Sequence, residues 1–492
     1  MLFCTTVLAI WAARLSCVNA QALPPSSYVP KAQNFTQKLN HDKPNDKTTF
    51  QQLYQMDATH FKPGGPILFH QSEESTMVPI ASNAFFDYAP EVGGILAGLE
   101  HRFFGSSFPA RSTYDNITTE DYKPLTLDNV LRDGVEFVNW IRRTVPGAEN
   151  SPVIYTGGSY GGFLAVMARV RHPETFHGSL SIAPLLTSFG HSSTLADNPF
   201  KFAATDWVAQ VYYDASVEAA IKIRDALSTL NACVSASNCT AALPDFNLCT
   251  QPTNKAEWSS LLWDLIAPQY ALVPQFDLGT LGQVLRAPIA LATGAMNLTS
   301  IESASCADWA NYSTSASVGL GAAWDYISCT YYIVTETDVS PTNPLYPTHD
   351  EHGPYTGCDT AGHPDWVGPS FNWRNQQWLE HYRITDAELD KVERLLIVQG
   401  SHDRTAAVGM PKLTPSPDRN HARVILGEGL AHGETIASEL VEPKGVKTQL
   451  DDIRGIQLEY IKAWTGSYGG ASNAATGAKV KRVGPVGRSW HA

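Results

Sequence analysis

Short unbroken runs of apolar residues recur along the chain, and several end in a polar loop that contains Gly. A strand that is buried on both faces carries such a continuous run, whereas a strand with one solvated face alternates apolar and polar residues. The runs predict buried strands within residues 66–69, 93–109, 153–155, 178–186, 394–400 and 422–429. A further segment, 48–57, is typical of one arm of a hairpin.

Helical spacing separates several of these runs. In the segment 125–143, apolar residues recur every three to four positions, which predicts a helix. Further helices are predicted from Phe163 onward and at 446–465. Strands that alternate with helices form a parallel sheet with helices on both faces. The predicted fold class is therefore α/β, with a doubly wound, mostly parallel sheet.

The alternation is interrupted by a long segment of different composition. Residues 188–384 are rich in Ala, Trp, Tyr, Ser and Asn, with helix-like stretches at 198–229 and 255–266. We interpret this segment as an inserted, mainly helical cap domain that contains disulfides. It divides the core into a first part, residues 21–187, and a second part, residues 385–465. Residues 21–48 are expected to be an extended lead-in, and residues 466–492, Gly/Ala/Ser-rich and then basic, a flexible tail.

The N-terminal segment indicates export. In residues 1–20, Leu2 to Ala13 is largely apolar, and Val18-Asn19-Ala20 offers small residues for cleavage, as in a secretory signal peptide. A buried N-terminal helix is the alternative, because no Lys or Arg precedes the apolar run. We expect a secreted protein, with a vacuolar or lysosome-like compartment as the alternative location.

Cysteines and glycosylation sequons agree with export. An even number of cysteines follows the signal segment, which suggests three disulfides without fixing their pairing. The candidates all lie in the predicted cap: Cys233, Cys239, Cys249, Cys306, Cys329 and Cys358. Asn-x-Ser/Thr triplets predict N-glycosylation at Asn34, Asn116, Asn238, Asn297 and Asn311.

Charge and motif content narrow the classes of partner. The 492 residues carry a net charge of −13, which argues against nucleic acid and anionic membranes as partners. No later segment approaches the roughly 20 apolar residues of a membrane span. The cysteine spacing does not resemble a zinc site and no C-x-x-C pair occurs, so we expect no metal and no cofactor. A homodimer is left open.

One segment joins a predicted strand directly to a predicted helix through Gly157-x-Ser159-x-Gly161. The two glycines remove the Cβ atoms that would clash where the strand folds back onto the helix, which leaves the Ser159 hydroxyl exposed at the tip of the turn. A Gly-rich structural turn is the alternative. The strand before it and the helix after it favour the nucleophile elbow of α/β-hydrolases.

A serine hydroxyl needs a base that accepts its proton and a carboxylate that orients the base. In α/β-hydrolases these follow the nucleophile in the order acid, then histidine. Asp403 comes directly after one predicted late strand, at the edge where open α/β sheets place function, and His432 comes after the next strand. We predict Asp403 as the triad acid and His432 as the general base. An Asx-turn residue is the alternative for Asp403, and His402 and His421 compete with His432.

Negative charge that develops on a carbonyl oxygen requires preorganised N–H donors. We predict the backbone N–H of Tyr160 as one oxyanion donor and a residue between Gln71 and Glu74 as the other. Glu73 and Glu74 also bring carboxylates near the site. Binding of a substrate amine and simple exposure to solvent both stay open for them.

Four stretches resemble the prolyl carboxypeptidase and dipeptidyl peptidase II family of serine peptidases, which includes fungal acid prolyl endopeptidases. They are GGPILFHQSEES (64–75), LEHRFFGSSFP (99–109), the elbow with the helix and strand that follow it (157–184), and the paired QGSHD and AHG that contain Asp403 and His432. The stretch WDYISCT (324–330) also resembles a family segment, and the likeness runs from about residue 45 to residue 465.

This resemblance implies an α/β-hydrolase core with a helical cap, a secretory or lysosome-like location, and hydrolysis of a peptide on the carboxyl side of proline through an acyl-enzyme. The resemblance also implies that Ser159 is the nucleophile, Asp403 the acid and His432 the base. In members that remove dipeptides, a Glu in the loop after the early strand engages the substrate amine, and Glu73 occupies that position.

Three departures from the family pattern fall on the rim of the pocket. No Pro-Trp pair follows Asp403, Gly433 stands where the family commonly has a second His, and the early loop reads Gln-Ser-Glu-Glu rather than a Gly-bearing version. Exopeptidase and endopeptidase action both stay open, as does a carboxylesterase or lipase on the same fold. A hydrolase-like binding protein typically lacks the Ser or the His, and this chain has both.

Overall fold

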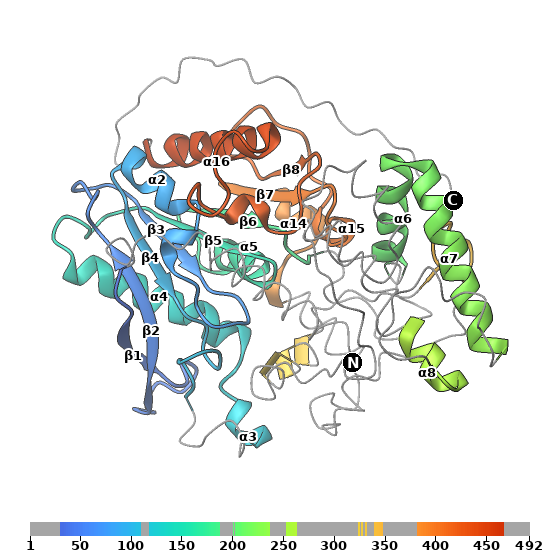
Figure 1. Cartoon of the computed structure of the whole chain (residues 1–492). Helices are drawn as coiled ribbons and strands as arrows, with labels where there is room; N and C mark the ends of the chain where they lie inside the picture. The colour runs from blue at the N-terminus through green and yellow to red at the C-terminus, as the bar shows by residue number, and fades with distance from the viewer. Residues whose placement is uncertain are drawn as a thin grey trace.

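The computed structural model describes residues 30–109, 118–186, 200, 202–236, 252–262, 339–347 and 381–466, together with the pairs 323–324, 326–327 and 330–331. These residues form a central sheet covered by helices. A second group of helices is inserted into the chain between two strands of the sheet and lies to one side of it (Figure 1).

The eight strands of the sheet lie in the order β1-β2-β4-β3-β5-β6-β7-β8. β1 pairs with β2, and β2 with β4, in antiparallel fashion, whereas all remaining pairs are parallel. This confirms the predicted mostly parallel sheet, and the strand order is that of the α/β-hydrolase fold. The strands are β1 Gln33–Lys38, β2 Thr49–Asp57, β3 Ile67–Gln71, β4 Ile95–Leu99, β5 Val153–Gly158, β6 Gly178–Ile182, β7 Leu395–Gly400 and β8 Arg423–Gly427.

Both faces of the sheet are covered by helices, which explains the unbroken apolar runs. Ile67 and Phe69 of β3 belong to a buried cluster with α4 (Leu127–Thr144) and α5 (Tyr160–Arg171). Leu68, between them, belongs to a cluster with α2 (Phe85–Val92) and α16 (Thr448–Gly466). Figure 1 shows these two pairs of helices on opposite sides of the strands. Successive side chains of a strand point to opposite faces, so a strand covered on both faces buries consecutive residues, as Ile67, Leu68 and Phe69 show.

The predicted helix at 125–143 corresponds to α4, whose start is capped. Thr126 Oγ1 accepts the backbone N–H of Asn129 at 3.1 Å, and this bond satisfies one of the N–H groups that a helix start leaves unpaired. Gly134 interrupts the apolar spacing for a packing reason. A Cβ at that position would lie 3.2 Å from the ring of Phe69.

Two core elements were not predicted. α2 connects β3 to β4, and such a connection is required because parallel neighbours need a crossover. Its eight residues contain Pro90, which obscures the helical pattern. The lead-in at 21–48 contains strand β1, which pairs with β2 along its whole length and places an additional edge strand on the sheet. The predicted hairpin arm at 48–57 is confirmed as β2.

The described helices of the inserted segment have a hydrophobic cluster of their own. α6 (Ala203–Ala215), α7 (Val217–Ala236) and α8 (Lys255–Ser260) bury Tyr212, Ile223 and Trp258 against one another. Short helices also occur in the described part of the core: η1 Ile80–Ser82, α3 Thr119–Tyr122, α14 Asp386–Leu389, α15 Ala406–Gly409 and η6 Glu434–Ile436.

Several sequence predictions concern residues outside the described ranges. These are the signal peptide, the tail beyond Gly466, the sequons at Asn116, Asn238, Asn297 and Asn311, and Cys239, Cys249, Cys306, Cys329 and Cys358. Of the candidate cysteines, Cys233 is described and is disulfide-bonded. Of the sequons, Asn34 is described and lies exposed on edge strand β1.

Candidate active site

Ser159 lies in a sharp turn between β5 and α5. Its φ of 52° and ψ of −120° are a strained backbone conformation for a residue with a side chain. A Cβ at Gly157 would lie 2.4 Å from the carbonyl oxygen of Gly161, so strand and helix meet there as the sequence predicted. The turn holds a half-buried Ser159 at the start of a helix.

Gly162 is a third required glycine that the sequence motif did not single out. A Cβ there would lie 2.4 Å from the carbonyl oxygen of Ile182 on β6. This contact brings the first turn of α5 directly onto the sheet. Ser159 N–H donates to the same Ile182 oxygen at 2.9 Å, so the neighbouring strand fixes both ends of the turn.

We expect Gly162→Ala to lower the free energy of unfolding by roughly 1–3 kcal/mol, because the added methyl group overlaps a backbone atom that cannot rotate away. Gly455→Ala is the matched control, since Gly455 is also within a helix but has nothing within 4 Å of its missing Cβ. That substitution should stabilise the chain by up to about 1 kcal/mol through helix propensity. Urea denaturation of both variants measures this, and a shift of the same sign for both would contradict the contact at Ile182.

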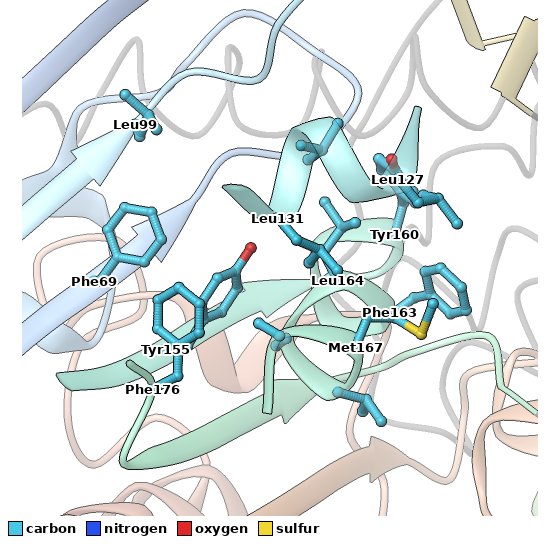
Figure 2. Close-up of a cluster of buried hydrophobic side chains, with 14 of the residues drawn as sticks. Phe69, Leu99, Leu127, Leu131, Tyr155, Tyr160, Phe163, Leu164, Met167 and Phe176 are labelled. Carbon is cyan, nitrogen blue, oxygen red and sulfur yellow. The ribbon is translucent and has the colours of Figure 1, made fainter. Parts of the chain in front are cut away.

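A cluster of aromatic side chains packs around the strand that precedes the turn. Figure 2 shows part of this cluster between β3, β5 and α5. The Phe69 and Tyr155 ring centroids lie 5.1 Å apart, and those of Tyr155 and Phe176 lie 4.9 Å apart, both in edge-to-face geometry, which favours such pairs. β5 is therefore anchored by the packing of Tyr155, four residues before Ser159.

Asp403 and His432 meet at the edge of the sheet where β7 and β8 end. His432 Nδ1 donates to Asp403 Oδ2 at 2.6 Å, and both side chains are buried. Asp403 also accepts the N–H of Thr405 at 2.9 Å and the hydroxyl of Thr405 at 2.5 Å. Several donors thus orient one carboxylate, which fixes the Nδ1–H tautomer of His432 and leaves Nε2 with the basic lone pair.

The contacts given for His421 and His402, the two competing histidines, differ from that of His432. His421 faces Asp390, with its Nε2 3.5 Å from Asp390 Oδ1. His402 N–H donates to the carbonyl oxygen of Leu430, so His402 belongs to the backbone turn before Asp403. The His432 ring contacts the Asp403 carboxylate directly. Asp403 and His432 follow Ser159 in the chain in that order.

The segment after His432 packs against the turn that carries Ser159. A Cβ at Gly158 would lie 3.3 Å from Cδ1 of Ile436 in η6. β5, β6, β7 and β8 are consecutive parallel neighbours, so their carboxyl ends share one edge of the sheet. Sheet order and the Ile436 contact place Ser159 and the Asp403–His432 pair on the same side of the molecule.

The inserted segment packs against the core next to these residues. The Trp324 ring packs edge-to-face on Tyr160, the residue after Ser159, at 5.3 Å between centroids. Trp207 of α6 donates its Nε1–H to the carbonyl oxygen of Ser401 at 3.0 Å. The insertion therefore contacts the chain beside both Ser159 and Asp403.

Oxyanion donors were predicted at the start of α5 and in the loop after β3. Tyr160 is the first residue of α5, and the first N–H groups of a helix have no partner within it. In the predicted span between Gln71 and Glu74, the N–H of Ser72 donates to Leu99 O at 3.0 Å. That bond excludes Ser72 as the second donor.

Glu73 and Glu74 do not face solvent, so one of the two alternatives for them was wrong. Their exposed fractions are 3% and 8%. Glu73 Oε1 accepts the N–H of Gly158 at 3.0 Å. Burial raises the pKa of Glu73 to about 7 and that of Glu74 to about 8.

The stretch 100–107 forms the layer behind the site. His101 donates from Nδ1 to the carbonyl oxygen of Arg102 at 2.6 Å, and its Nε2 accepts the Tyr160 hydroxyl at 3.2 Å. Burial lowers the pKa of His101 to about 4, so the ring is neutral. Glu100 closes the loop by accepting the Ser106 N–H at 2.8 Å and the Ser107 hydroxyl at 2.7 Å. This network, which the motif did not reveal, supports Tyr160.

A buried ion pair fixes the same loop to α4. Arg102 donates from Nε and Nη2 to the two oxygens of Asp133, each at 2.6 Å. Its other donors bind the carbonyl oxygens of Lys38, Leu39 and Pro124. The exposed fractions of Arg102 and Asp133 are 0% and 1%.

We expect Arg102→Met to lower the free energy of unfolding by about 3–5 kcal/mol, because it removes the guanidinium from the buried Asp133 carboxylate and leaves it with His41, whose Nε2 is 2.8 Å from Asp133 Oδ1. The matched control is Arg132→Met, which removes a surface pair with Asp42 at 2.8 Å and should cost less than about 1 kcal/mol. Equal losses for the two variants, measured by chemical denaturation, would contradict this.

The described residues contain neither a metal-ligand cluster nor a membrane-spanning helix. No group of three or more His, Cys, Asp or Glu side chains there is placed to hold a metal ion. Within the same residues, no helix is both long and apolar enough to cross a membrane.

Comparison with known proteins identifies the family. Residues 37–337 match the family described as serine carboxypeptidase S28, which is more than half of the chain. The chain belongs to the serine carboxypeptidase S28 family. This S28 member is 34% identical over 177 residues to the "Lysosomal Pro-X carboxypeptidase" of Pongo abelii, a match that covers 35% of each chain. It is 33% identical over 207 residues to the Homo sapiens protein of the same name, covering 38% of this chain and 41% of that one.

The S28 chain thus spans less than half the length of the curated relatives it matches. Among solved structures it resembles the proline iminopeptidase of Mycobacterium smegmatis, with 13% identity and a TM-score of 0.38 over 88% of this chain and 99% of that chain. The fold assignment of the S28 member rests on its own strand order and on the turn at Ser159.

Proposed function

We propose that the protein is a serine peptidase with Ser159 as nucleophile, His432 as general base and Asp403 as the orienting acid. The observation that carries the proposal is the 2.6 Å contact between His432 Nδ1 and Asp403 Oδ2 at the sheet edge that also carries Ser159, in a member of the S28 family. The strained turn presents a serine hydroxyl, and the buried pair supplies the base that such a hydroxyl needs.

The reaction is a two-step acyl transfer. Ser159 Oγ attacks the scissile carbonyl carbon while His432 Nε2 accepts the hydroxyl proton, and Asp403 stabilises the imidazolium that forms. The oxyanion is stabilised by the N–H of Tyr160 and by a donor from the loop after β3. His432 then protonates the leaving amine, and water hydrolyses the acyl-enzyme by the same route.

The proposed substrate is a peptide that is cleaved on the carboxyl side of proline. The names of two curated relatives, both Lysosomal Pro-X carboxypeptidase, support this substrate. The relatives' names and the signal-like N-terminus favour a secreted or lysosome-like location.

Product analysis tests this function. Mass spectrometry of digests should show cleavage after proline in peptides that carry proline near either end or in the middle, and no cleavage in matched peptides with Ala in place of Pro. The position of the cut also decides between exopeptidase and endopeptidase action. Hydrolysis of simple esters without any cleavage of peptide bonds would contradict the peptidase and favour a carboxylesterase or lipase.

A further inference from the structure

The carboxyl group of Glu73 lies against the nucleophile turn on both sides of Ser159. Its Oε1 accepts the N–H of Gly158, the residue before Ser159, at 3.0 Å. A Cβ at Gly161 would lie 3.1 Å from Cγ and 3.2 Å from Oε1 of the same side chain. Glu73 therefore fills the space that the glycines of the turn leave open and accepts a hydrogen bond from the backbone N–H of Gly158.

No cation compensates this carboxyl group among the described residues around it. The nearest basic side chain is His70 of β3, whose Nε2 is 3.9 Å from Glu73 Oε2. Burial lowers the pKa of His70 to about 4, and its Nδ1 accepts the amide of Asn83 at 3.1 Å, so the ring is a neutral donor at Nε2.

The other titratable neighbours carry no positive charge toward Glu73 either. Glu74, the next residue, is a second buried carboxyl, and Tyr155 of β5 is a buried phenol. The η6 side faces Gly158 with apolar Ile436. The titratable residues of that side, His432 and Glu434, are paired with Asp403 and Lys447.

We propose that Glu73 is a positioning residue: its neutral, protonated carboxyl group holds the nucleophile turn in place. Reaction at Ser159 then becomes slower when this carboxyl group ionises. This inference rests on Ser159 being the nucleophile, as proposed above. A neutral carboxyl accepts the Gly158 N–H through its carbonyl oxygen without placing charge beside the turn. An ionised one adds a negative charge next to the position where the oxyanion must form, and this charge opposes it.

The direction of the pH dependence follows from burial. The ordinary pKa of this carboxyl is 4.5, and burial raises it to about 7 in the folded chain. Between these values the folded state retains a proton that the unfolded state has lost, so the contribution of Glu73 to stability falls as pH rises through this window. Glu73 therefore lowers the stability of the folded chain progressively as the pH rises from 4.5 to about 7, and its carboxyl group is mostly ionised above that pH.

The test is the rate at which a fluorophosphonate labels Ser159, measured from pH 5 to pH 8 in the wild type and in Glu73→Gln. The amide keeps a carbonyl acceptor for Gly158 but cannot ionise. Dividing the variant rate by the wild-type rate cancels the pH effects that the two proteins share. We expect this ratio to be near unity at pH 5 and to rise to about tenfold at pH 8, one pH unit above the titration of Glu73. A flat ratio, or a folded variant that is unreactive at every pH, would overturn the proposal.

Asp87→Asn is the matched control. Asp87 is a partly buried carboxyl on α2 that accepts the N–H of Glu439 at 2.7 Å, and burial raises its pKa to about 6, but it does not touch the turn. The ratio of the Asp87→Asn labelling rate to the wild-type rate should not change with pH. If Glu73→Gln does not fold, Glu73→Met replaces it, with a lower rate and the same rising ratio. Failure of both neutral variants to fold at pH 5 would also contradict a role for the neutral carboxyl.

The outcomes separate this inference from the proposed function. A wild-type chain that is not labelled at Ser159 would refute the nucleophile itself. Labelling of the wild type together with a flat Glu73→Gln ratio would refute the role of Glu73 and leave the nucleophile intact.

Discussion

Ser159→Ala is expected to lower kcat on a proline-containing peptide by roughly 10⁴- to 10⁶-fold, with little change in KM. The substitution removes the oxygen atom that forms the acyl-enzyme, whereas the Tyr160 backbone N–H and the residues packed around the turn remain. The residual rate reflects these donors acting on water. Steady-state kinetics on the purified variant, with the thermal midpoint recorded alongside, measures the effect.

Ser181→Ala is the control for this experiment. Ser181 is buried on β6 and donates its hydroxyl to the carbonyl oxygen of Gly162 at 2.8 Å, so it also lies against the nucleophile turn. Its loss should cost about 1 kcal/mol of stability and leave kcat within a few-fold of the wild type. A Ser159→Ala variant that retains a tenth or more of the wild-type kcat would refute Ser159 as nucleophile.

The second large effect is expected for Asp403→Asn, at about 10⁴-fold in kcat. Asp403 Oδ2 accepts from both His432 Nδ1 and Thr405 Oγ1. An amide NH₂ in its place favours the His432 tautomer that has the proton on Nε2, which cannot accept the proton of Ser159. The fold should persist, because the amide has nearly the shape of the carboxylate.

Thr405→Val is the matched control for Asp403→Asn. It removes one charge-assisted hydrogen bond to the carboxylate, worth about 1.5–3 kcal/mol, and leaves the His432 tautomer intact. Its kcat should fall by no more than about a hundredfold. Similar losses for both variants would show that Asp403 acts through the loop around it and not through His432.

The sequence predicted most of the core because its strands are covered on both faces. Runs such as Ile67–Phe69 need apolar residues at each position, which is a strong signal. The positions of Asp403 and His432 followed from chain order, since both come directly after buried strands. β1 was missed because an exposed edge strand carries few apolar residues.

Contacts between distant segments could not be predicted in the same way. Glu73 reaches Gly158 across 85 positions of the chain, and Tyr160 reaches His101 across 59. Neither pair leaves a local pattern, because a polar residue that is buried by tertiary packing looks like a loop residue in the sequence. The need for glycine at position 162 was missed for the same reason, because it arises from the close approach of Ile182 on another strand.

The central claim is that Ser159 forms an acyl-enzyme with a proline-ended acyl group. The most direct test is a rapid-mixing experiment with a peptide p-nitrophenyl ester whose acyl end is proline, followed by acid quench and peptide mapping by mass spectrometry. We predict a stoichiometric burst of p-nitrophenol and an adduct on the peptide that contains Ser159, with a much smaller burst for the Ala-ended ester. Steady turnover with no adduct, or an adduct on any other residue, would contradict the account.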